Sequence, residues 1–328
     1  MKTFAGSYCP RRRRVLCLLL VFLLLVPLCA SGERKVFWAR ETEPFPEGAE
    51  LLTVRVAGLF SADCMLVTLG EHSMFVDLGI IASMKQIKEV IREAGISEVE
   101  YFFNSHPHND HIGGFMPLVE SGFPVGTMMT FFPHMFIAKN TMQLQAVKTA
   151  ETHHIPITDM KTGDTIPFGS AEVTAYRVPK HRTDLRLDVN DLSAMLMIRY
   201  GDCSILLTAD VEHRAQRALV EEYGSLLKAD IMKVPHHGVS AAEFSFLDAV
   251  DPEFVFFTRY PTGTRIAQKQ LAERGVRRMA FSTWGVITLQ TDGHKWIASQ
   301  NLNPEMEHHV RLYQKEAPWL ELPFTLPR

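Results

Sequence analysis

Apolar residues follow two different periods along this chain, one of two residues and one of about 3.6 residues. In the first half, apolar positions alternate with polar ones or form short apolar runs at residues 50–56, 64–69, 74–76 and 99–103, which predicts strands. Between the last two, residues 83–94 gather their apolar side chains on one face and predict a helix. The chain is therefore expected to begin with antiparallel strands and to continue as strand, helix and strand.

The second half repeats this order. Strands are predicted at residues 194–199, 204–208, 230–234, 254–257, 278–282, 286–290 and 295–298, with two more inside 165–178. Helices are predicted at residues 211–227, 241–250 and 266–274. Because hairpins followed by strand–helix alternation occur twice, we expect an α/β fold in which two packed sheets lie between outer helices.

The two ends of the chain differ from this pattern. Four arginines, residues 11–14, precede an apolar run over residues 15–30, which predicts a secretory signal over residues 1–32. The alternative is a membrane anchor, because about 16 apolar residues are almost enough to span a bilayer. We therefore expect a secreted or extracytoplasmic protein, or one anchored to a membrane by this segment alone. One domain is expected over residues 33–302, followed by an irregular, proline-rich tail over residues 303–328.

Charge and cysteine content narrow the range of partners. Residues 1–32 contain five basic residues and no acidic ones, which leaves residues 33–328 with 29 basic and 37 acidic residues, a net charge of −8. Because proteins that bind long nucleic acids usually present a basic surface, this balance counts against a long nucleic acid, which stays open through a local basic patch, and is compatible with a small anionic substrate. Cys64 and Cys203 are the two cysteines after Gly32, and they are expected to be buried free thiols.

A cluster of metal-binding residue types follows the strand predicted at residues 99–103. His106 and His108 are two positions apart, so on an extended loop their side chains point the same way and can share one cation. Asp110 and His111 turn away at the start of the next helix and can serve a second cation. Imidazole and carboxylate ligands suit Zn²⁺ and similar divalent ions.

Two later segments can supply the remaining ligands. The strand predicted at residues 204–208 is followed by Asp210, which could bridge two metals or cap the helix predicted to start at residue 211. The strand at residues 230–234 is followed by His236 and His237. We expect one of this pair to bind metal and the other to support the ligands or to donate a proton.

Three motifs together resemble the metallo-β-lactamase superfamily, and more narrowly the soluble domain of ComEC/Rec2-type competence proteins. They are HPHNDH followed by IGG from residue 106, LLTAD at residues 206–210, and KVPHHG at residues 233–238. FVDLG, which contains Asp77, resembles the family's strand-end aspartate motif, and TWG at residues 283–285 resembles its late turn. The resemblance covers most of the chain between Leu51 and Gly293.

This resemblance implies a four-layer αββα sandwich with two divalent metal ions at one edge of the sheets, zinc first and manganese as the alternative. It places His106 and His108 on the first metal and Asp110 and His111 on the second, with Asp210 between them. His237 is expected to complete the second site, with His236 as its alternative and as the candidate catalytic proton donor. Asp110 is expected to orient a metal-activated water for attack, and Asp77 to support the ligands.

The sequence departs from the family at one ligand. The superfamily's further histidine before the bridging aspartate is missing, and Asn190 and Ser193 stand there, as in the competence-type subgroup. Because an amide oxygen is a weaker ligand than imidazole, the first site is expected to be weak, with His181 as a candidate replacement. The glycine-rich turn is altered to end in Asp63, and Tyr260 stands in place of the subgroup's histidine, so substrate contacts are expected to differ.

Hydrolysis of a phosphodiester by a metal-activated water, as in a phosphodiesterase or nuclease, is the function that the resemblance favours. Lys180, Arg182 and Arg186 precede Asn190 and are candidates for contacting a phosphate group. One alternative keeps the metal chemistry but cleaves an amide, lactone or ester bond, β-lactams included. A second alternative is a surface binding module without catalytic activity on the same fold.

Overall fold

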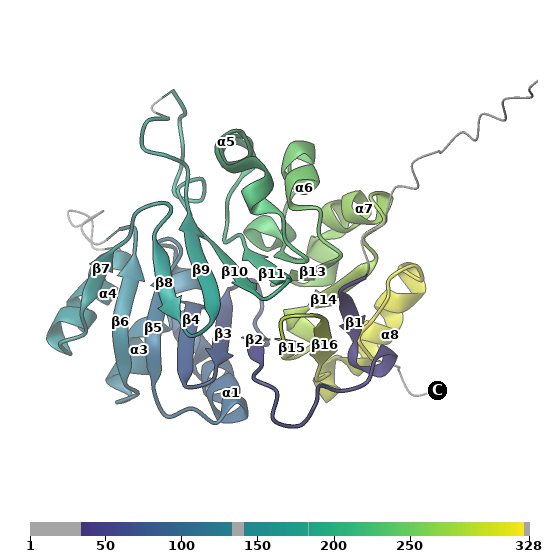
Figure 1. The fold of residues 1–328 in the computed structure, drawn as a ribbon, viewed down its shortest axis with the longest axis horizontal. Helices are drawn as coiled ribbons and strands as arrows, with labels where there is room; N and C mark the ends of the chain where they lie inside the picture. The colour runs from purple at the N-terminus through teal and green to yellow at the C-terminus, as the bar shows by residue number, and fades with distance from the viewer. Residues whose placement is uncertain (1–33, 133–140, 183, 325–328) are drawn as a thin grey trace, which may run out of the picture. The chain divides into compact units, whose positions relative to one another are not determined.

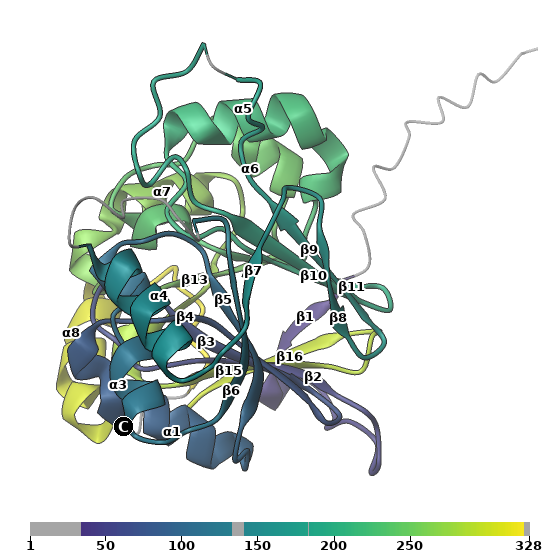
Figure 2. The same cartoon turned by 90° about the vertical axis from the view of Figure 1, so that its left-hand side faces the viewer.

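Two β-sheets pack face to face in the computed structural model, and helices cover their outer faces (Figures 1 and 2). The structure describes residues 34–132, 141–182 and 184–324, and the chain from Arg34 to Arg328 forms one compact unit. The predicted signal segment, residues 1–32, lies outside the described residues. Among the helices of the described part, none combines the length and apolar character needed to cross a membrane.

The first sheet has nine strands in the order β1-β16-β15-β2-β3-β4-β5-β6-β7. In chain order their bounds are β1 Val36–Trp38, β2 Leu52–Val56, β3 Cys64–Leu69, β4 His72–Leu78, β5 Val99–Asn104, β6 Val125–Thr130, β7 Ile157–Asp159, β15 Ile287–Thr291 and β16 Trp296–Gln300. Strands β4 to β7 run parallel to one another, so their carboxyl ends lie at one edge.

The second sheet has seven strands in the order β14-β13-β12-β11-β10-β9-β8. In chain order their bounds are β8 Thr165–Phe168, β9 Ala171–Tyr176, β10 Met195–Tyr200, β11 Cys203–Leu207, β12 Ile231–Lys233, β13 Phe254–Phe257 and β14 Arg278–Phe281. Strands β11 to β14 are parallel, and they bring the segments that follow β11, β12 and β13 together at one edge.

Each outer face of the sandwich is covered by its own helices. The first sheet packs against α1 Met84–Ala94, α3 Phe115–Glu120 and α4 Met142–Thr152. The second packs against α5 His213–Tyr223, α6 Phe244–Val250, α7 Arg265–Glu273 and α8 Glu307–Glu316. Figure 2 shows α3 and α4 on one side of the sheets and α5, α6 and α7 on the other. The predicted four-layer αββα architecture is confirmed.

Alternation along the strands explains why the sheets face each other. In β2, Leu52, Val54 and Val56 enter the core between the two sheets, and in β10 Leu196 and Ile198 enter the same core from the opposite side. Their neighbours along β10, Met195 and Met197, point the other way, toward the helices outside the second sheet. Successive side chains of a strand point to opposite faces, so strands covered on both sides must be apolar at nearly every position.

The tail contradicts one expectation. Residues 303–328 were expected to be irregular, but helix α8 forms there and buries Val310 and Tyr313 against the second sheet's helical layer. The separation expected after residue 302 is therefore wrong, because this segment belongs to the same compact unit as the sheets. The expectation for the cysteines is confirmed, since Cys64 and Cys203 are both buried and free.

Candidate metal centre

The loops that follow strands of both sheets meet at one point. The loop after β5 carries His106 to His111, and the short helix α2 Asn109–Ile112 turns Asp110 and His111 toward the second sheet. The second sheet contributes Asp210 after β11 and the pair His236 and His237 after β12. Residues from three distant stretches of the sequence are thus brought within contact distance, as the sequence predicts.

One carboxylate oxygen lies at the centre of this convergence. Oδ2 of Asp210 is 3.2 Å from Nε2 of His111 and 3.3 Å from Nε2 of His237. Nε2 of His236 lies 3.8 Å from it and Nε2 of His106 lies 3.9 Å from it. Asp210 does not cap a helix, because α5 begins at His213 with Glu212 at its N-cap position. Four imidazoles therefore face a single oxygen atom.

The donor atoms fit a divalent metal. Nε2 of His111 and Nε2 of His237 are buried and have no hydrogen-bond partner of good geometry among the described residues. Nε2 of His237 also lies 3.4 Å from Oδ2 of Asp110, whose side chain is 35% exposed. Buried polar atoms are nearly always paired, so orphaned nitrogens beside two carboxylates indicate a place for a cation. These residues are the ones assigned to the second metal by the family resemblance.

The other ring nitrogens of these histidines are held by further side chains. Nδ1 of His111 is 2.7 Å from Oδ2 of Asp77. Nδ1 of His237 is 2.8 Å from Oγ1 of Thr258 and 3.1 Å from Oδ1 of Asp63. One oxygen of Asp63 lies within 4.8 Å of a ligand atom of each of His111, Asp210 and His237, so Asp63 could bind the metal itself. Because it faces the Nδ1 side while Asp210 faces the Nε2 side, we assign Asp63 to orienting the rings.

Lys233 lies beside this cluster with a fully buried side chain, and no other lysine or arginine among the described residues does so. Its Nζ lies 2.8 Å from Oδ2 of Asp63 and 3.6 Å from Oδ1 of Asp210, and it donates a hydrogen bond to the carbonyl of Ala209 at 2.8 Å. It therefore holds the outer oxygen of Asp210 and leaves Oδ2 facing the imidazoles. Its charge also offsets part of the negative charge of the buried carboxylates.

The first pair of histidines begins beside His111, since the ring centroids of His106 and His111 are 4.1 Å apart. Nε2 of His106 is 3.0 Å from Nδ1 of His108, so these two nitrogens face the same small volume. Oγ of Ser105 lies 3.0 Å from Nδ1 of His106, and the Ser105 hydroxyl and backbone N–H both donate to Asp77. Asp77 thus supports ligands of both expected sites, His111 directly and His106 through Ser105.

Backbone strain is concentrated here. Of the seven described residues other than glycine with positive φ, four belong to the centre: Asp77, Ala209, His236 and His237. Such conformations cost about 1–3 kcal/mol each and persist where the surroundings demand them. The two successive left-handed histidines are followed by Gly238 at φ 84°, where an added Cβ would lie 2.5 Å from the ring of Phe257.

Burial and charge set the protonation of the cluster in opposite directions. Burial, together with the charge on His111, lowers the pKa of His106 well below its usual value. Burial alone would also lower the pKa of His237, but the charges of Asp210 and Asp63 outweigh it and raise that pKa to about 10. The pKa of His111 is raised for the same reason, by Asp210, Asp77 and Asp63. Without metal, protons therefore occupy His111 and His237, where the second cation would bind, while His106 is neutral.

Two further residues from the sequence prediction border the centre. The backbone N–H of Ala194 donates to the carbonyl of Ser105, which places the loop of Asn190 and Ser193 against the histidine loop. Nδ2 of Asn190 donates to Oε1 of Glu212 at 3.2 Å, and the hydroxyl of Ser193 is buried without a hydrogen-bond partner in the described residues. Their predicted part in metal binding stays a prediction.

Other candidates lie elsewhere. His181 is 67% exposed and lies 3.8 Å from Glu222, and its expected role as a replacement ligand stays a prediction. Arg182 pairs with Asp184 and Glu221, which already neutralise its guanidinium group, and this does not support the predicted phosphate contact. Lys180 and Arg186 are exposed, and their expected role in substrate binding stays a prediction.

The sequence analysis missed several residues that shape the centre. Asp63 was noted only as part of an altered turn, and Lys233 only as a letter in a motif, while Glu212 and Thr258 were not singled out. The signal was present for two of them: Lys233 is the one charged residue in the apolar run at residues 231–234, and Asp63 directly precedes the strand predicted at residues 64–69. A charge placed among buried residues needs a partner of opposite sign, and Lys233 and Asp63 are each other's partner.

An aromatic pair lies near the cluster along the chain. The rings of Phe60 and Tyr260 are nearly parallel, at 12°, with centroids 6.4 Å apart, and Phe60 is 62% exposed. Phe60 precedes Asp63 by three residues, and Tyr260 follows Thr258 by two. Between them, Nη1 of Arg259 donates to Oγ of Ser61 at 3.3 Å. A cation and two aromatic faces are thus available for binding an organic anion.

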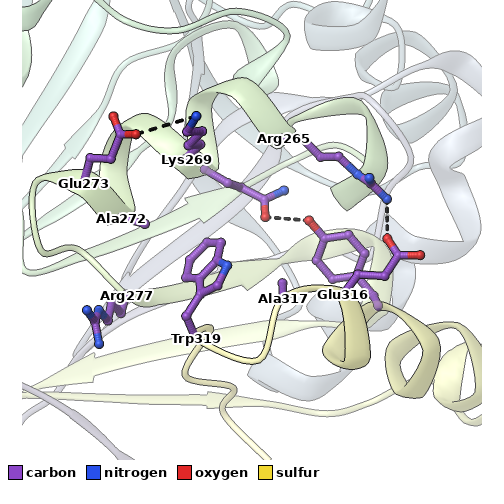
Figure 3. Close-up of a pocket in the computed structure, with 10 residues that line it drawn as sticks. Arg265, Lys269, Ala272, Glu273, Arg277, Glu316, Ala317 and Trp319 are labelled. Carbon is purple, nitrogen blue, oxygen red and sulfur yellow. Dashed lines mark hydrogen bonds and ion pairs between the residues drawn. The ribbon is translucent and has the colours of Figure 1, made fainter.

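A separate cavity of about 430 Å³ lies between α7 and α8 (Figure 3). Trp319 and Tyr313 line it together with Lys269 and Arg277, and the ion pair between Arg265 and Glu316 crosses one side. None of the described cluster residues contributes to its lining. This cavity is therefore distinct from the metal centre.

Comparison with known proteins agrees with this geometry. Residues 57–185 match the family model of the metallo-beta-lactamase superfamily. The chain is 23% identical over 300 residues to competence protein ComA of Neisseria gonorrhoeae, a match that covers 87% of this chain and 39% of that protein. The chain thus spans about two fifths of the length of this curated relative. The predicted resemblance to the superfamily and to competence proteins is confirmed.

The fold is similar to that of a solved structure. A mutant of the CmlA beta-hydroxylase superposes with a TM-score of 0.50 at 16% identity, covering 76% of this chain and 55% of that one. The metallo-beta-lactamase fold protein YhfI from Bacillus subtilis superposes with a TM-score of 0.48 at 14% identity, covering 71% of this chain and 96% of that one. At such low identity the likeness concerns the fold alone, and the reaction must be argued from the site.

Proposed function

We propose that this chain, which has the metallo-β-lactamase fold, is a metal-dependent hydrolase that cleaves a phosphodiester. The observation that carries the proposal is the position of Asp210, whose Oδ2 has four imidazole nitrogens within 3.9 Å. A purely structural carboxylate needs one or two hydrogen-bond donors, whereas four imidazoles around one oxygen, with Asp110 3.4 Å from one of them, form a typical set of ligands for divalent cations.

Two divalent ions, zinc first and manganese as the alternative, would supply a nucleophilic water at neutral pH and would polarise the scissile bond. The chain's own residues position the reactants. Asp110 is the most exposed carboxylate of the cluster, so it is the group that can contact the attacking water and take its proton. Asp77, Asp63 and Lys233 lie behind the ligands and hold their orientation.

His236 has two chemically reasonable roles. Its ring is 27% exposed, so it could donate a proton to the leaving group, with Glu212 at 2.9 Å from Nδ1 as the partner that holds it. Its Nε2 also faces Asp210 at 3.8 Å, which suits metal binding. Both roles were expected from the sequence, and the two are separated by counting metals.

A phosphodiester is favoured over other substrates for two reasons. The curated relative is a competence protein, and the net charge of −8 over residues 33–328 favours a small anionic substrate over long nucleic acid. Arg259 and the aromatic pair of Phe60 and Tyr260 offer contacts for such a substrate. Export, with the hydrolase outside the cytoplasm or anchored by residues 1–32, is part of the proposal and rests on the sequence of that segment.

The test is a comparison of substrates with the purified chain loaded with Zn²⁺ or Mn²⁺. We expect turnover of bis-p-nitrophenyl phosphate and of nucleoside phosphodiesters, loss of turnover after chelation, and recovery when metal returns. Faster turnover of nitrocefin or of a lactone would show that the preferred substrate has an amide, lactone or ester bond instead of a phosphodiester. A chain that binds metal but turns over none of these substrates would favour the non-catalytic binding module.

A further inference from the structure

The histidine that the family places on the first metal is missing from this chain, and the structure offers another imidazole. Nε2 of His236 lies 3.8 Å from Oδ2 of Asp210, nearly the same separation as the 3.9 Å between Nε2 of His106 and that oxygen. We infer that His236 is the third imidazole ligand of the first metal, beside His106 and His108, while His237 serves the second. The inference rests on the proposed function only in requiring cations at this centre.

The second metal does not need His236. His237 is within 3.4 Å of Asp110 and 3.3 Å of Asp210, and His111 approaches Asp210 from the same cluster. These four side chains already give two imidazoles and two carboxylates, a full set for one divalent ion. The first metal has His106, His108 and Asp210, one imidazole fewer than the family's set. Oδ1 of Asn190 is buried without a hydrogen-bond partner among the described residues, but an amide oxygen is a weaker ligand than imidazole. His236 fills that deficit.

The backbone explains how neighbouring histidines can serve two different ions around one oxygen. In an extended strand, successive side chains point to opposite faces. Here His236 and His237 have φ values of 46° and 54°, and Gly238 continues the left-handed turn at 84°. The turn directs Nε2 of both rings toward Oδ2 of Asp210, while the ring centroids stay 5.9 Å apart. A strained turn of this kind is retained where both side chains have a use.

A carboxylate fixes the ring of His236 in the orientation that binding requires. Oε1 of Glu212 lies 2.9 Å from Nδ1 of His236, so this nitrogen donates its proton to the carboxylate and the lone pair of Nε2 faces Asp210. Asn190, which occupies the position of the missing histidine, donates to the same oxygen of Glu212 at 3.2 Å. In this chain Asn190 therefore supports a ligand through Glu212.

Metal stoichiometry tests this assignment without any substrate. The full chain and its variants are stripped of metal, titrated with Zn²⁺ by calorimetry and counted by elemental analysis, with circular dichroism to establish folding. We expect two zinc ions in the unmodified chain, one in H236A and one in H237A. The matched control is H294A, which removes a histidine that is 82% exposed, and it should keep two.

Double variants assign each histidine to a site. H106A/H236A should keep one zinc ion, because both residues belong to the first site, whereas H236A/H237A should keep none. One ion in H236A/H237A and none in H106A/H236A would place His236 on the second metal and overturn the inference. Two ions in H236A at unchanged affinity would overturn it in favour of proton donation.

A milder variant keeps the test decisive where H236A fails to fold. E212Q removes the carboxylate partner of His236 and should weaken one zinc site by about 10- to 100-fold while leaving the other unchanged. If E212Q bound zinc at both sites with the same affinities as the unmodified chain, the inference would be contradicted. An unmodified chain that binds no zinc or manganese would instead refute the proposed function, which distinguishes the two failures.

Discussion

Lys233 and Asp63 form an ion pair of 2.8 Å in which neither side chain is exposed to solvent. The pair lies directly beside the centre, since Asp63 contacts Nδ1 of His237 and Lys233 contacts the outer oxygen of Asp210. Two residues from different sheets, 170 positions apart, thus join the halves of the sandwich at the point where the ligands meet.

Replacing Lys233 by methionine is expected to lower both stability and metal affinity. Removing one partner of a buried ion pair leaves an uncompensated charge and costs about 3–5 kcal/mol of unfolding free energy. Metal affinity should fall by about 10- to 100-fold, because Asp210 loses the group that orients it. Urea unfolding and zinc titration measure the two effects.

The matched control for that change is the double variant K233M/D63N. It removes the remaining charge as well, so it should be more stable than K233M alone. A double variant less stable than K233M would show that the contact of Asp63 with His237 stabilises the fold by more than the unpaired carboxylate costs.

Substitution of Asp210 by alanine is expected to abolish binding of both metals. Its Oδ2 has four imidazole nitrogens within 3.9 Å, and no other carboxylate oxygen of the described residues has as many. Activity should fall by about a thousandfold or more, equivalent to a loss of about 4 kcal/mol of transition-state stabilisation. D202A, which removes a carboxylate with 78% of its side chain exposed, serves as control and should keep both metals. Full metal content in D210A would refute its bridging role.

Truncation of Phe60 to alanine should affect substrate binding rather than folding. The side chain is 62% exposed, so its loss should change the unfolding free energy by less than about 0.5 kcal/mol. Stacking of an aromatic substrate group on Phe60 is worth about 1–3 kcal/mol, so KM should rise about tenfold with little change in kcat. L226A, which removes another exposed apolar side chain, should leave KM unchanged. Equal KM values in both variants would exclude Phe60 from substrate binding.

The two buried cysteines should resist alkylation while the chain is folded. Burial raises the pKa of Cys203 to about 11, and burial with the nearby Asp77 and Asp63 raises the pKa of Cys64 as well. A raised pKa leaves only about a thousandth of the Cys203 thiol as reactive thiolate at pH 8. Iodoacetamide labelling followed by peptide mass spectrometry should show modification of both cysteines only in denaturant. Rapid labelling of Cys203 at pH 8 without denaturant would contradict this.

Strands with a clear apolar period could be predicted from the sequence because burial on both faces dictates their composition. Strand β6 was missed, since Gly126 and two methionines interrupt its β-branched residues Val125, Thr127 and Thr130. Gly126 is nevertheless required there, because a Cβ would lie 2.5 Å from the carbonyl of Glu100. Helix α8 was missed because four prolines dominate its segment, although Pro304 lies before the helix, in a short 3₁₀ turn where proline is tolerated.

The ligands could be predicted for a different reason. Histidines and aspartates at the ends of buried strands have few structural uses, so residue type and position were sufficient for His106, His111 and Asp210. The partners of these ligands could not be predicted in the same way. Glu212 and Thr258 are ordinary surface and turn residues in sequence, and their roles depend on how the second sheet places them against the histidine pair.

The rigid support of the imidazoles has a consequence for ion selectivity. Asp77, Thr258 and Glu212 fix three of the rings through Nδ1 before any cation arrives, so the spacing of the donor atoms is set by the protein. Ca²⁺ prefers six to eight oxygen ligands at about 2.3–2.6 Å, and Mg²⁺ prefers octahedral oxygen and keeps much of its water. A nitrogen-rich centre with fixed geometry should reject both, even where they greatly outnumber zinc and manganese, as in fluids outside the cell.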